Sequence, residues 1–356
     1  MITSKEISFV VQGAVNTKET RKCLKSIRKY MPDSEIILST WDGSDVSGLD
    51  YDILILNKDP GAVYLEYRKN YHNLNRQLFS TQEGLKRVTR KYAMKLRSDM
   101  ILTSDKFLEY FDKFQKRSAN YNLFKRKVLI PAIFTRFNVY KPDDPKSIFH
   151  ISDLWLFGLK EDLDTYFLDT KLVEELYFAK YFEREENKNK STRYGKNPAK
   201  FPAECYFGYS CFHRNFKDIY MDDASDYSDE LMEKFRECLV NNFIVLEFKH
   251  SGIRLNKYLF CQNEKFLAEE YLALYNFYRY EYEYKKYCDF SYEITSNKRF
   301  FENERYGTAI LRFYKHIYRL INNKHSILAK TEYFFTIIPI AIITLIQISR
   351  AVLQEK

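Results

Sequence analysis

The sequence predicts an α/β fold with a mostly parallel sheet that is flanked by helices. Within the first hundred residues, short apolar runs alternate with segments of helical spacing, which is the pattern of parallel strands covered by helices. The chain has 356 residues, of which 45% are hydrophobic and 17% aromatic, so a large buried core can form. Ten glycines and eight prolines are too few for a collagen-like or linker-rich architecture.

The N-terminal elements follow one another in a regular order. Two segments have helical spacing, and the first places Cys23, Leu24, Ile27 and Tyr30 on one side. Apolar runs bounded by Asp, Gly, Asn or Pro predict the strands. The predicted strands are residues 7–11, 35–41, 51–56, 92–102 and 128–134, and the predicted helices between them are 18–30 and 73–88.

The rest of the chain is expected to be mainly helical. Residues 153–159 predict a strand or a tight turn that leads into an amphipathic helix at 160–182, and residues 243–248 predict one more strand. Residues 183–200 are charged, polar and punctuated by glycine and proline, which is typical of a mobile surface loop. Residues 258–287 are rich in Tyr and Phe, which favours a packed helical face over a base-stacking platform.

The C-terminal part of the sequence predicts a membrane-associating region. Residues 333–348 carry no charge, but they are shorter than the roughly 20 residues that span a bilayer, and Pro339 interrupts them. The segment 310–324 has the pattern of a basic amphipathic helix. Packing of the tail on the body of the protein is an equal alternative. The expected parts are a main domain at 1–255, an aromatic-rich, basic helical extension at 256–332 and an apolar tail at 333–356.

The composition limits the partners and the compartment. The net charge of +9 comes from 57 basic and 48 acidic side chains that are interspersed. This favours a mixed solvated surface over a nucleic-acid face, and it fits phosphate-bearing substrates or an anionic membrane. The six cysteines make no close pair, and the N-terminus lacks the long apolar stretch of a secretory signal. We therefore expect a cytoplasmic protein with reduced thiols.

Loops that follow the strands are the place to search for ligand contacts, because open parallel sheets bind ligands beyond the carboxyl ends of their strands. Four such loops carry polar residues, at 12–17, 42–45, 57–61 and 97–99. The first places a glycine and backbone N–H groups before a helix, which suits a diphosphate. It matches neither Gly-x-Gly-x-x-Gly nor the Walker motif, which disfavours dinucleotide enzymes and P-loop NTPases.

Arg97 and Asp99 form a charged pair at the end of an apolar strand, where an unpaired charge is costly. A divalent cation on Asp99, with Arg97 facing a phosphate, would satisfy both side chains. An ion pair that closes the sheet would satisfy them equally well, and both interpretations stay open.

Three stretches of the N-terminal part stand out as a set: ISFVVQGAV, CLKSIRKYMPDSEIILSTWDGSDVSGLDYDILILNKDPG and NLNRQLFSTQEGLKRVTRKYAMKLRSDMIL. They resemble the WavE lipopolysaccharide-synthesis family, a group of bacterial glycosyltransferase-like proteins related to the GT-A nucleotide-sugar fold. The resemblance covers roughly residues 7–250. It implies that residues 1–255 form a GT-A-like (Rossmann-type) domain that binds a nucleotide sugar and carries the catalytic residues.

The resemblance implies donor contacts at the strand ends. Gln12 and Gly13 would contact the nucleotide, as would the loop that bears Asp42, while Asn57 and Asp59 look like uridine or ribose contacts. The helix residues that would lean over the sugar diphosphate are Asn73, Asn75, Arg76 and Gln77.

Arg97-Ser98-Asp99 occupies the place where GT-A enzymes carry Asp-x-Asp. Because Arg97 replaces the first acidic residue, dependence on Mn²⁺ or Mg²⁺ stays open. Asp99 could bind the metal alone, or Arg97 could supply part of the cation's charge. His250 follows the last strand-like run, where GT-A enzymes often place a metal-binding histidine; a core histidine is the alternative.

Two carboxylates compete as the general base that deprotonates the acceptor. Asp153 in HISDLWLFGL is preferred, and Glu204 in PAECYFGY is its rival. For each, a helix-capping role is an alternative. Trp155 is available to stack on an acceptor sugar, and His150 could line the same acceptor site.

The resemblance thus implies an inverting glycosyltransferase that uses a nucleotide sugar, preferably a UDP-sugar. The acceptor would be lipid-linked or an oligosaccharide of lipopolysaccharide core, O-antigen or capsule. The expected location is the cytoplasmic face of the inner membrane, and no nucleic-acid partner is expected. Two alternatives are a sugar nucleotidyltransferase, which the single glycine of QGAVNT disfavours, and a non-catalytic membrane- or nucleic-acid-binding adaptor.

Overall fold

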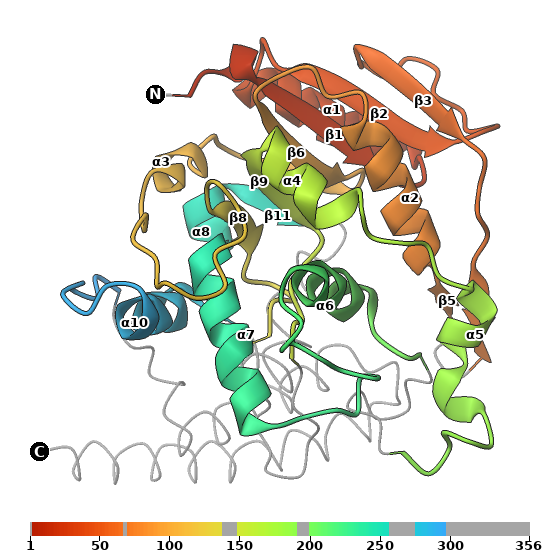
Figure 1. The fold of residues 1–356 in the computed structure, drawn as a ribbon. Helices are drawn as coiled ribbons and strands as arrows, with labels where there is room; N and C mark the ends of the chain where they lie inside the picture. Colours follow the sequence, from red (N-terminus) through yellow and green to blue (C-terminus); the bar gives the residue numbers. More distant parts are fainter. Residues whose placement is uncertain (1, 67–69, 137–147, 191–198, 256–274, 297–356) are drawn as a thin grey trace, which may run out of the picture.

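A seven-stranded, mostly parallel sheet forms the centre of the molecule (Figure 1). The computed structural model describes residues 2–66, 70–136, 148–190, 199–255 and 275–296. The strand order is β10-β8-β9-β6-β1-β2-β3, and β9 runs antiparallel to both of its neighbours. The predicted α/β class is confirmed. The strands are β1 (Ile7–Gln12), β2 (Glu35–Trp41), β3 (Ile53–Asn57), β6 (Tyr92–Arg97), β8 (Val128–Pro131), β9 (Trp155–Leu159) and β10 (Phe243–Leu246).

Strand β1 lies inside the sheet, and its sequence explains why. All six of its residues are buried, because β2 and β6 pair with its two edges and helices cover its two faces. A continuous apolar run is what such a strand needs. Its last residue, Gln12, pairs with Ser39 on β2 and Arg97 on β6. Polar side chains therefore meet at the carboxyl edge of the sheet.

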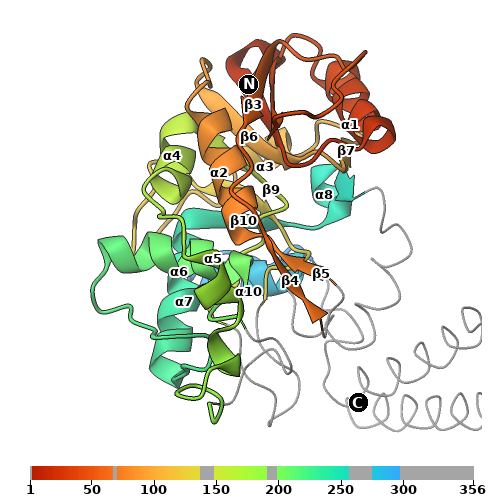
Figure 2. The same ribbon diagram turned by 90° about the vertical axis from the view of Figure 1, so that its right-hand side faces the viewer.

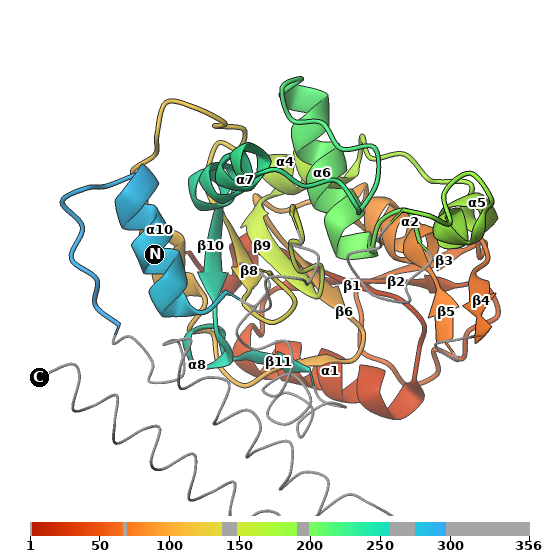
Figure 3. The same ribbon diagram turned by 90° about the horizontal axis from the view of Figure 1, so that it is seen from below.

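Helices cover both faces of the sheet (Figure 3). α1 (Thr17–Tyr30) lies on one face, and α2 (Leu74–Leu85), α4 (Lys160–Phe167) and α6 (Ala203–Asn215) lie on the other. α1 begins where the Asn16 side chain accepts a hydrogen bond from the backbone N–H of Glu19 at 3.3 Å. Its buried face contains Cys23, Leu24 and Ile27 as predicted, while the predicted Tyr30 is only partly buried against the core.

The predicted helix at 160–182 is broken into two. α4 ends at Phe167, and α5 (Glu175–Ala179) follows after a turn. The side-chain amide of Gln82 on α2 donates to the carbonyls of Phe167 at 2.8 Å and Thr170 at 2.7 Å. Because these bonds satisfy carbonyls at the end of α4, the chain can leave the helix there and cross α2.

Two small antiparallel pairs flank the sheet. β4 (Val63–Leu65) and β5 (Asn70–His72) form a hairpin that extends beside α5 (Figure 2). β7 (Met100–Leu102) pairs with β11 (Ile253–Leu255). The predicted strand at 92–102 is therefore two strands, because the chain turns after Arg97 and β7 takes a different partner.

The remaining described helices are α3 (Leu108–Phe111), α7 (Asp229–Asn242), α8 (Phe248–Ser251) and α10 (Phe277–Tyr287), with 3-10 turns at Ser4–Glu6 and Tyr181–Glu183. α10 buries part of the aromatic-rich stretch. Its Tyr280 and Tyr284 rings both lie 5.1 Å from the ring of Phe114. In this helix the aromatic residues form a packed face, as predicted, and residues 258–274 lie outside the described residues.

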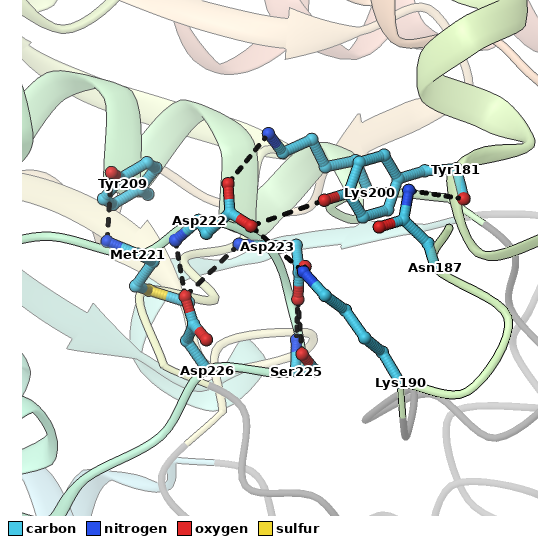
Figure 4. Close-up of polar contacts among 10 residues, drawn as sticks. All are labelled: Tyr181, Asn187, Lys190, Lys200, Tyr209, Met221, Asp222, Asp223, Ser225 and Asp226. Atoms are coloured by element: carbon cyan, nitrogen blue, oxygen red, sulfur yellow. Dashed lines mark hydrogen bonds and ion pairs between the residues drawn. The ribbon is translucent and has the colours of Figure 1, made fainter. Parts of the chain in front are cut away.

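A polar network anchors the described ends of the segment predicted as a mobile loop (Figure 4). Lys190 Nζ lies 2.7 Å from Asp223 and 3.1 Å from Asp222. Lys200 Nζ lies 3.6 Å from Asp222, and Asn187 donates to the carbonyl of Tyr181 at 3.2 Å. Residues 183–190 thus form ordered structure, while residues 191–198 lie outside the described residues.

Most of the predicted C-terminal parts lie outside the described residues. Of the extension at 256–332 only residues 275–296 are described, and the tail at 333–356 lies wholly outside. None of the helices in the described ranges has the length and apolar composition needed to cross a bilayer.

Candidate functional site

A cavity of about 610 Å³ opens at the carboxyl ends of β1, β2 and β6. Gln12, Trp41 and Arg97, the last residues of these three strands, all line it. Eight of the predicted site residues meet there: Gln12, Gly13, Asp59, Asn73, Arg76, Gln77, Arg97 and Asp99. The remaining lining residues are Ala14, Val15, Asn16, Glu19, Trp41 and Ser98.

The loop after β1 forms one wall of this cavity, and Gly13 makes that path possible. Its φ of +113° lies in a region that L-residues with side chains rarely adopt. The N–H of Gly13 donates to the carbonyl of Ser39 at 3.1 Å, so the chain turns sharply at the end of the strand. Residues 14–16 then lead into the N-terminus of α1, where the helix dipole favours negative charge.

Two arginine–carboxylate pairs dominate the charge of the cavity. Arg76 Nε donates to Asp59 at 2.7 Å, and Nη2 donates to the other oxygen. Arg97 bonds Asp99 in the same way, at 3.1 and 2.8 Å. The hydrogen bonds from Arg76 lower the pKa of Asp59. With Glu19, the lining holds three acidic and two basic side chains, a net charge of −1.

A buried hydrogen-bond network lies below the cavity. Ser80 on α2 donates to Gln12 Oε1 at 2.8 Å, and its own carbonyl accepts from Ser39 at 2.7 Å. Asn57 in turn donates to Ser39 Oγ at 2.9 Å and to the carbonyl of Thr40 at 2.9 Å. The network joins α2 to the ends of β1, β2 and β3. Asn57 is therefore used inside the protein and does not line the cavity.

A buried lysine, Lys95, lies on β6 below the cavity. Lys95 precedes Arg97 by two residues, so both side chains point to the same face of β6. Lys95 is 1% exposed, its Nζ donates to the carbonyl of Asp153, and it lies 3.9 Å from the Asp153 carboxylate. Burial lowers the pKa of Lys95 to about 8. Burial also raises the pKa of Asp153, and this effect is larger than the opposite effect of the Lys95 charge, which lowers it.

Besides burial, the charge of Glu204 raises the pKa of the competing carboxylate, Asp153. Glu204 begins the first turn of α6, and its charge acts on both Lys95 and Asp153. Asp153 is 4% exposed, whereas Glu204 is half-buried. The charges of Glu204 and of Arg97, which lines the cavity, therefore reach the buried pair of Lys95 and Asp153. Asp153 and Glu204 themselves are not among the described residues that line the cavity.

Comparison with known protein families shows to which family the chain belongs. The model of the family described as WavE lipopolysaccharide synthesis matches residues 7–315. The chain belongs to the WavE lipopolysaccharide synthesis family. Among solved structures, it is similar to the crystal structure of the glycosyltransferase GlyE from Streptococcus pneumoniae TIGR4, at 14% identity and a TM-score of 0.27. That match covers 61% of this chain and 44%, less than half, of the other. No curated protein matches.

Two predicted acceptor contacts, Trp155 and His150, are buried in the core of this WavE-family protein. Trp155 is 1% exposed, because β9 lies between β6 and β8 with both faces covered. His150 is 3% exposed and its Nδ1 lies 2.8 Å from the carbonyl of Phe134. Burial lowers the pKa of His150 to about 3, so this imidazole is neutral. Neither ring offers a face to an acceptor.

Three other predicted residues lie away from the cavity. Asp42 is exposed in the turn after β2, where its side chain accepts from the N–H of Gly43 at 3.0 Å. Asn75 is buried and exchanges two hydrogen bonds with the backbone of Val173, at 2.8 and 2.9 Å. His250 lies on α8, where its ring centroid is 4.1 Å from that of Phe277. The described residues contain no cluster of three or more His, Cys, Asp or Glu able to hold a metal.

Sequence reasoning missed several residues of this site in the WavE-family chain. Trp41 lines the cavity at the end of β2 and is half-buried. Its position directly before the Asp42-Gly43 turn could have identified it as the last residue of a strand. Lys95 could have been found as a lysine inside an apolar strand. Gln77 was predicted, but its buried Oε1 atom has no hydrogen-bond partner among the described residues, and no sequence pattern reveals that.

Proposed function

We propose that this WavE-family protein is a GT-A-type glycosyltransferase that uses a nucleotide sugar, preferably a UDP-sugar, to extend a bacterial surface polysaccharide. The observation that carries the proposal is the cavity at the carboxyl ends of β1, β2 and β6, which eight of the eleven predicted donor residues line. Its volume of about 610 Å³ falls within the range of small-ligand sites, and its position is where α/β sheets bind ligands.

The cavity offers a separate contact for each part of a nucleotide sugar. The half-exposed indole of Trp41 provides a face on which a base can stack. The loop 13–16 and the N-terminus of α1 favour a diphosphate. The unpartnered Oε1 of Gln77 needs a donor, which a sugar or ribose hydroxyl supplies, because a buried polar atom without a partner is costly.

The charge of the cavity bears on the metal. Both arginines are already paired with carboxylates, and the lining carries a net charge of −1, so a diphosphate alone would meet repulsion. Asp59 and Asp99 offer the oxygen ligands that Mg²⁺ and Mn²⁺ prefer, which fits a cation at Asp99. When bound, the cation would neutralise charge on the leaving diphosphate. Arg76 and Arg97 would then orient the diphosphate and stabilise the charge that develops on it.

The acceptor base is better assigned to Glu204 than to Asp153. Asp153 is nearly inaccessible and lies beside Lys95, so an acceptor hydroxyl cannot reach it without opening the core. Glu204 is half-buried and lies at the start of α6. Glu204 would take the proton from the acceptor hydroxyl. Inversion at the anomeric carbon stays part of this proposal.

The acceptor is proposed from the family and from exposed aromatic residues near the cavity. The family description concerns lipopolysaccharide synthesis, which suits a lipid-linked or oligosaccharide acceptor. Tyr64 and Tyr71 on the β4–β5 hairpin are 40% and 55% exposed, with ring centroids 5.1 Å apart. β5 ends at His72, directly before Asn73, which lines the cavity, so the hairpin stands next to the cavity. These rings replace Trp155 as the surface on which an acceptor sugar would stack.

The test is a panel of nucleotide sugars with the wild-type protein and the Asp99→Asn variant. Thermal stabilisation by one donor, larger with Mn²⁺ or Mg²⁺ present, is expected for the wild type. The variant should lose the metal-dependent part of that stabilisation and most of the donor hydrolysis. Asp42→Asn, a matched change outside the cavity, should behave as the wild type. Equal behaviour of Asp99→Asn and the wild type would refute the placement of the active site.

A further inference from the structure

A second feature at the surface is a basic face on α1. Lys18, Arg21, Lys22 and Lys25 recur at helical spacing, and all four side chains are exposed. The opposite side of the helix is buried against the sheet, so this face must point outward. Over its whole length α1 carries six basic residues and one acidic residue.

Two acidic side chains lie near this basic face, and the charge of Arg21 acts on one of them, Asp45. Lys22 is paired with Glu19 at 3.2 Å. For Lys18 and Lys25, no ion pair with an acidic side chain occurs within the described part of the chain. A cavity of about 400 Å³ opens along the helix, and its described lining consists of Thr17, Lys18, Arg21, Lys22 and Lys25. The described part of this lining, with four cations and no acid, fits a phosphate group.

We propose that the basic face of α1 binds the headgroups of an anionic lipid surface. Lipid is favoured over nucleic acid because the described lining of the groove includes no aromatic side chain, whereas single-stranded nucleic acids are held largely by base stacking. A straight row of cations on an outward helix face matches a flat anionic surface. This proposal does not depend on the proposed sugar transfer.

The position of α1 gives this contact a consequence for the main cavity. Asn16 and Glu19, at the N-terminus of the helix, line the main cavity, and Thr17 and Lys18 line the basic groove. α1 lies on the face of the sheet opposite α2 and α6 (Figure 3). When α1 rests on headgroups, the mouth of the main cavity therefore lies next to the membrane, where a lipid-linked acceptor would be.

The test compares the full-length protein with a triple variant, K18E/R21E/K25E, in sedimentation with vesicles. Vesicles of neutral phosphatidylcholine serve as the reference, and vesicles with added phosphatidylglycerol carry the anionic charge. The measured quantity is the ratio of the two partition coefficients, which removes any apolar contribution from the rest of the chain. One basic residue near an anionic surface contributes about fivefold, so loss of three positive charges should lower the ratio on the order of a hundredfold, and the three new negative charges should lower it further.

The matched control is R87E/R90E/K91E, which makes the same three charge reversals. These exposed residues stand before β6, at the opposite end of the sheet from the main cavity. The control should keep the wild-type ratio within a few-fold, and thermal unfolding confirms that both variants fold. An equal fall in both variants, or no fall in K18E/R21E/K25E, would overturn the proposal. Loss of single-stranded RNA binding without loss of vesicle binding would overturn it as well.

Discussion

At the scale of single residues, the arginines of the cavity are held before any ligand arrives. Arg76 is bonded to Asp59 through two of its nitrogens, and about a third of each side chain is exposed. A bidentate pair of this kind is oriented but weakened by solvent. The same guanidinium can therefore serve a diphosphate if Asp59 releases it or binds a cation.

The first prediction concerns the exchange of Asp59 for a diphosphate as the partner of Arg76. Asp59→Asn removes the competing charge from Arg76, so UDP without metal should bind about three- to tenfold more tightly. Arg76→Met should weaken binding about 10- to 100-fold, since a hydrogen bond to a charged group is lost. Calorimetric titration with UDP measures both values. Weaker binding of UDP by Asp59→Asn would show that Asp59 itself contacts the nucleotide and that the exchange does not occur.

The second prediction concerns the buried pair of Lys95 and Asp153. Lys95→Met leaves the Asp153 carboxylate buried without its partner, so the free energy of unfolding should fall by about 3–5 kcal/mol. Adding Asp153→Asn to this variant should recover part of the loss. Urea denaturation measures these changes. A Lys95→Met protein as stable as the wild type would show that the pair does not support the fold.

The pH dependence of that pair has a definite sign. The pKa of Lys95 is about 8 in the folded protein, below its ordinary value near 10.5. Between these two pH values the unfolded chain binds the extra proton, so the contribution of Lys95 to stability rises with pH. The stability of the wild type minus that of Lys95→Met should therefore increase from pH 8 to pH 10. A difference that stays constant over this range would contradict the lowered pKa.

At the scale of elements, the contact between α2 and β1 positions the cavity. Arg76, Gln77 and Ser80 all lie on α2, so the distance of this helix from the sheet sets the shape of the site. The helix comes close because residue 84 is glycine. A Cβ at Gly84 would lie 2.2 Å from Cγ1 of Val10, well inside van der Waals contact.

The third prediction follows from this close packing. Gly84→Ala should lower the free energy of unfolding by about 1–3 kcal/mol, because overpacking outweighs the better helix propensity of alanine. Gly84→Ala combined with Val10→Ala makes room for the new methyl group and should cost less than the sum of the two single changes. Thermal unfolding of the four proteins measures this coupling. Strict additivity would mean that α2 does not pack on Val10 as described.

The elements also mark what the sequence could and could not predict. Apolar runs placed the strands of the parallel sheet, because buried strands need continuous apolar residues. Breaks caused by distant partners were missed. The strand at 92–102 divides because β7 pairs with β11, and the helix at 160–182 divides beside Gln82. Both depend on contacts between segments far apart in the chain.

At the scale of the whole molecule, the rule that ligands bind at the carboxyl edge of the sheet identified most of the cavity lining. It could not tell lining residues from supporting ones. Asn57 and Asn75 stand in the expected places, but their amides bond to the protein itself. Trp155 resembled an acceptor contact, yet the strand order puts it in the core. Burial is a property of the assembled fold, and spacing along the chain does not report it.

The most direct test of the account is a crystal structure of the protein with a UDP-sugar and Mn²⁺. We expect the diphosphate in the cavity at the ends of β1, β2 and β6, within hydrogen-bond distance of Arg76 or Arg97. The uracil ring should stack on Trp41, and the cation should lie on Asp99. A nucleotide bound elsewhere on the protein, with this cavity empty, would contradict the central claim.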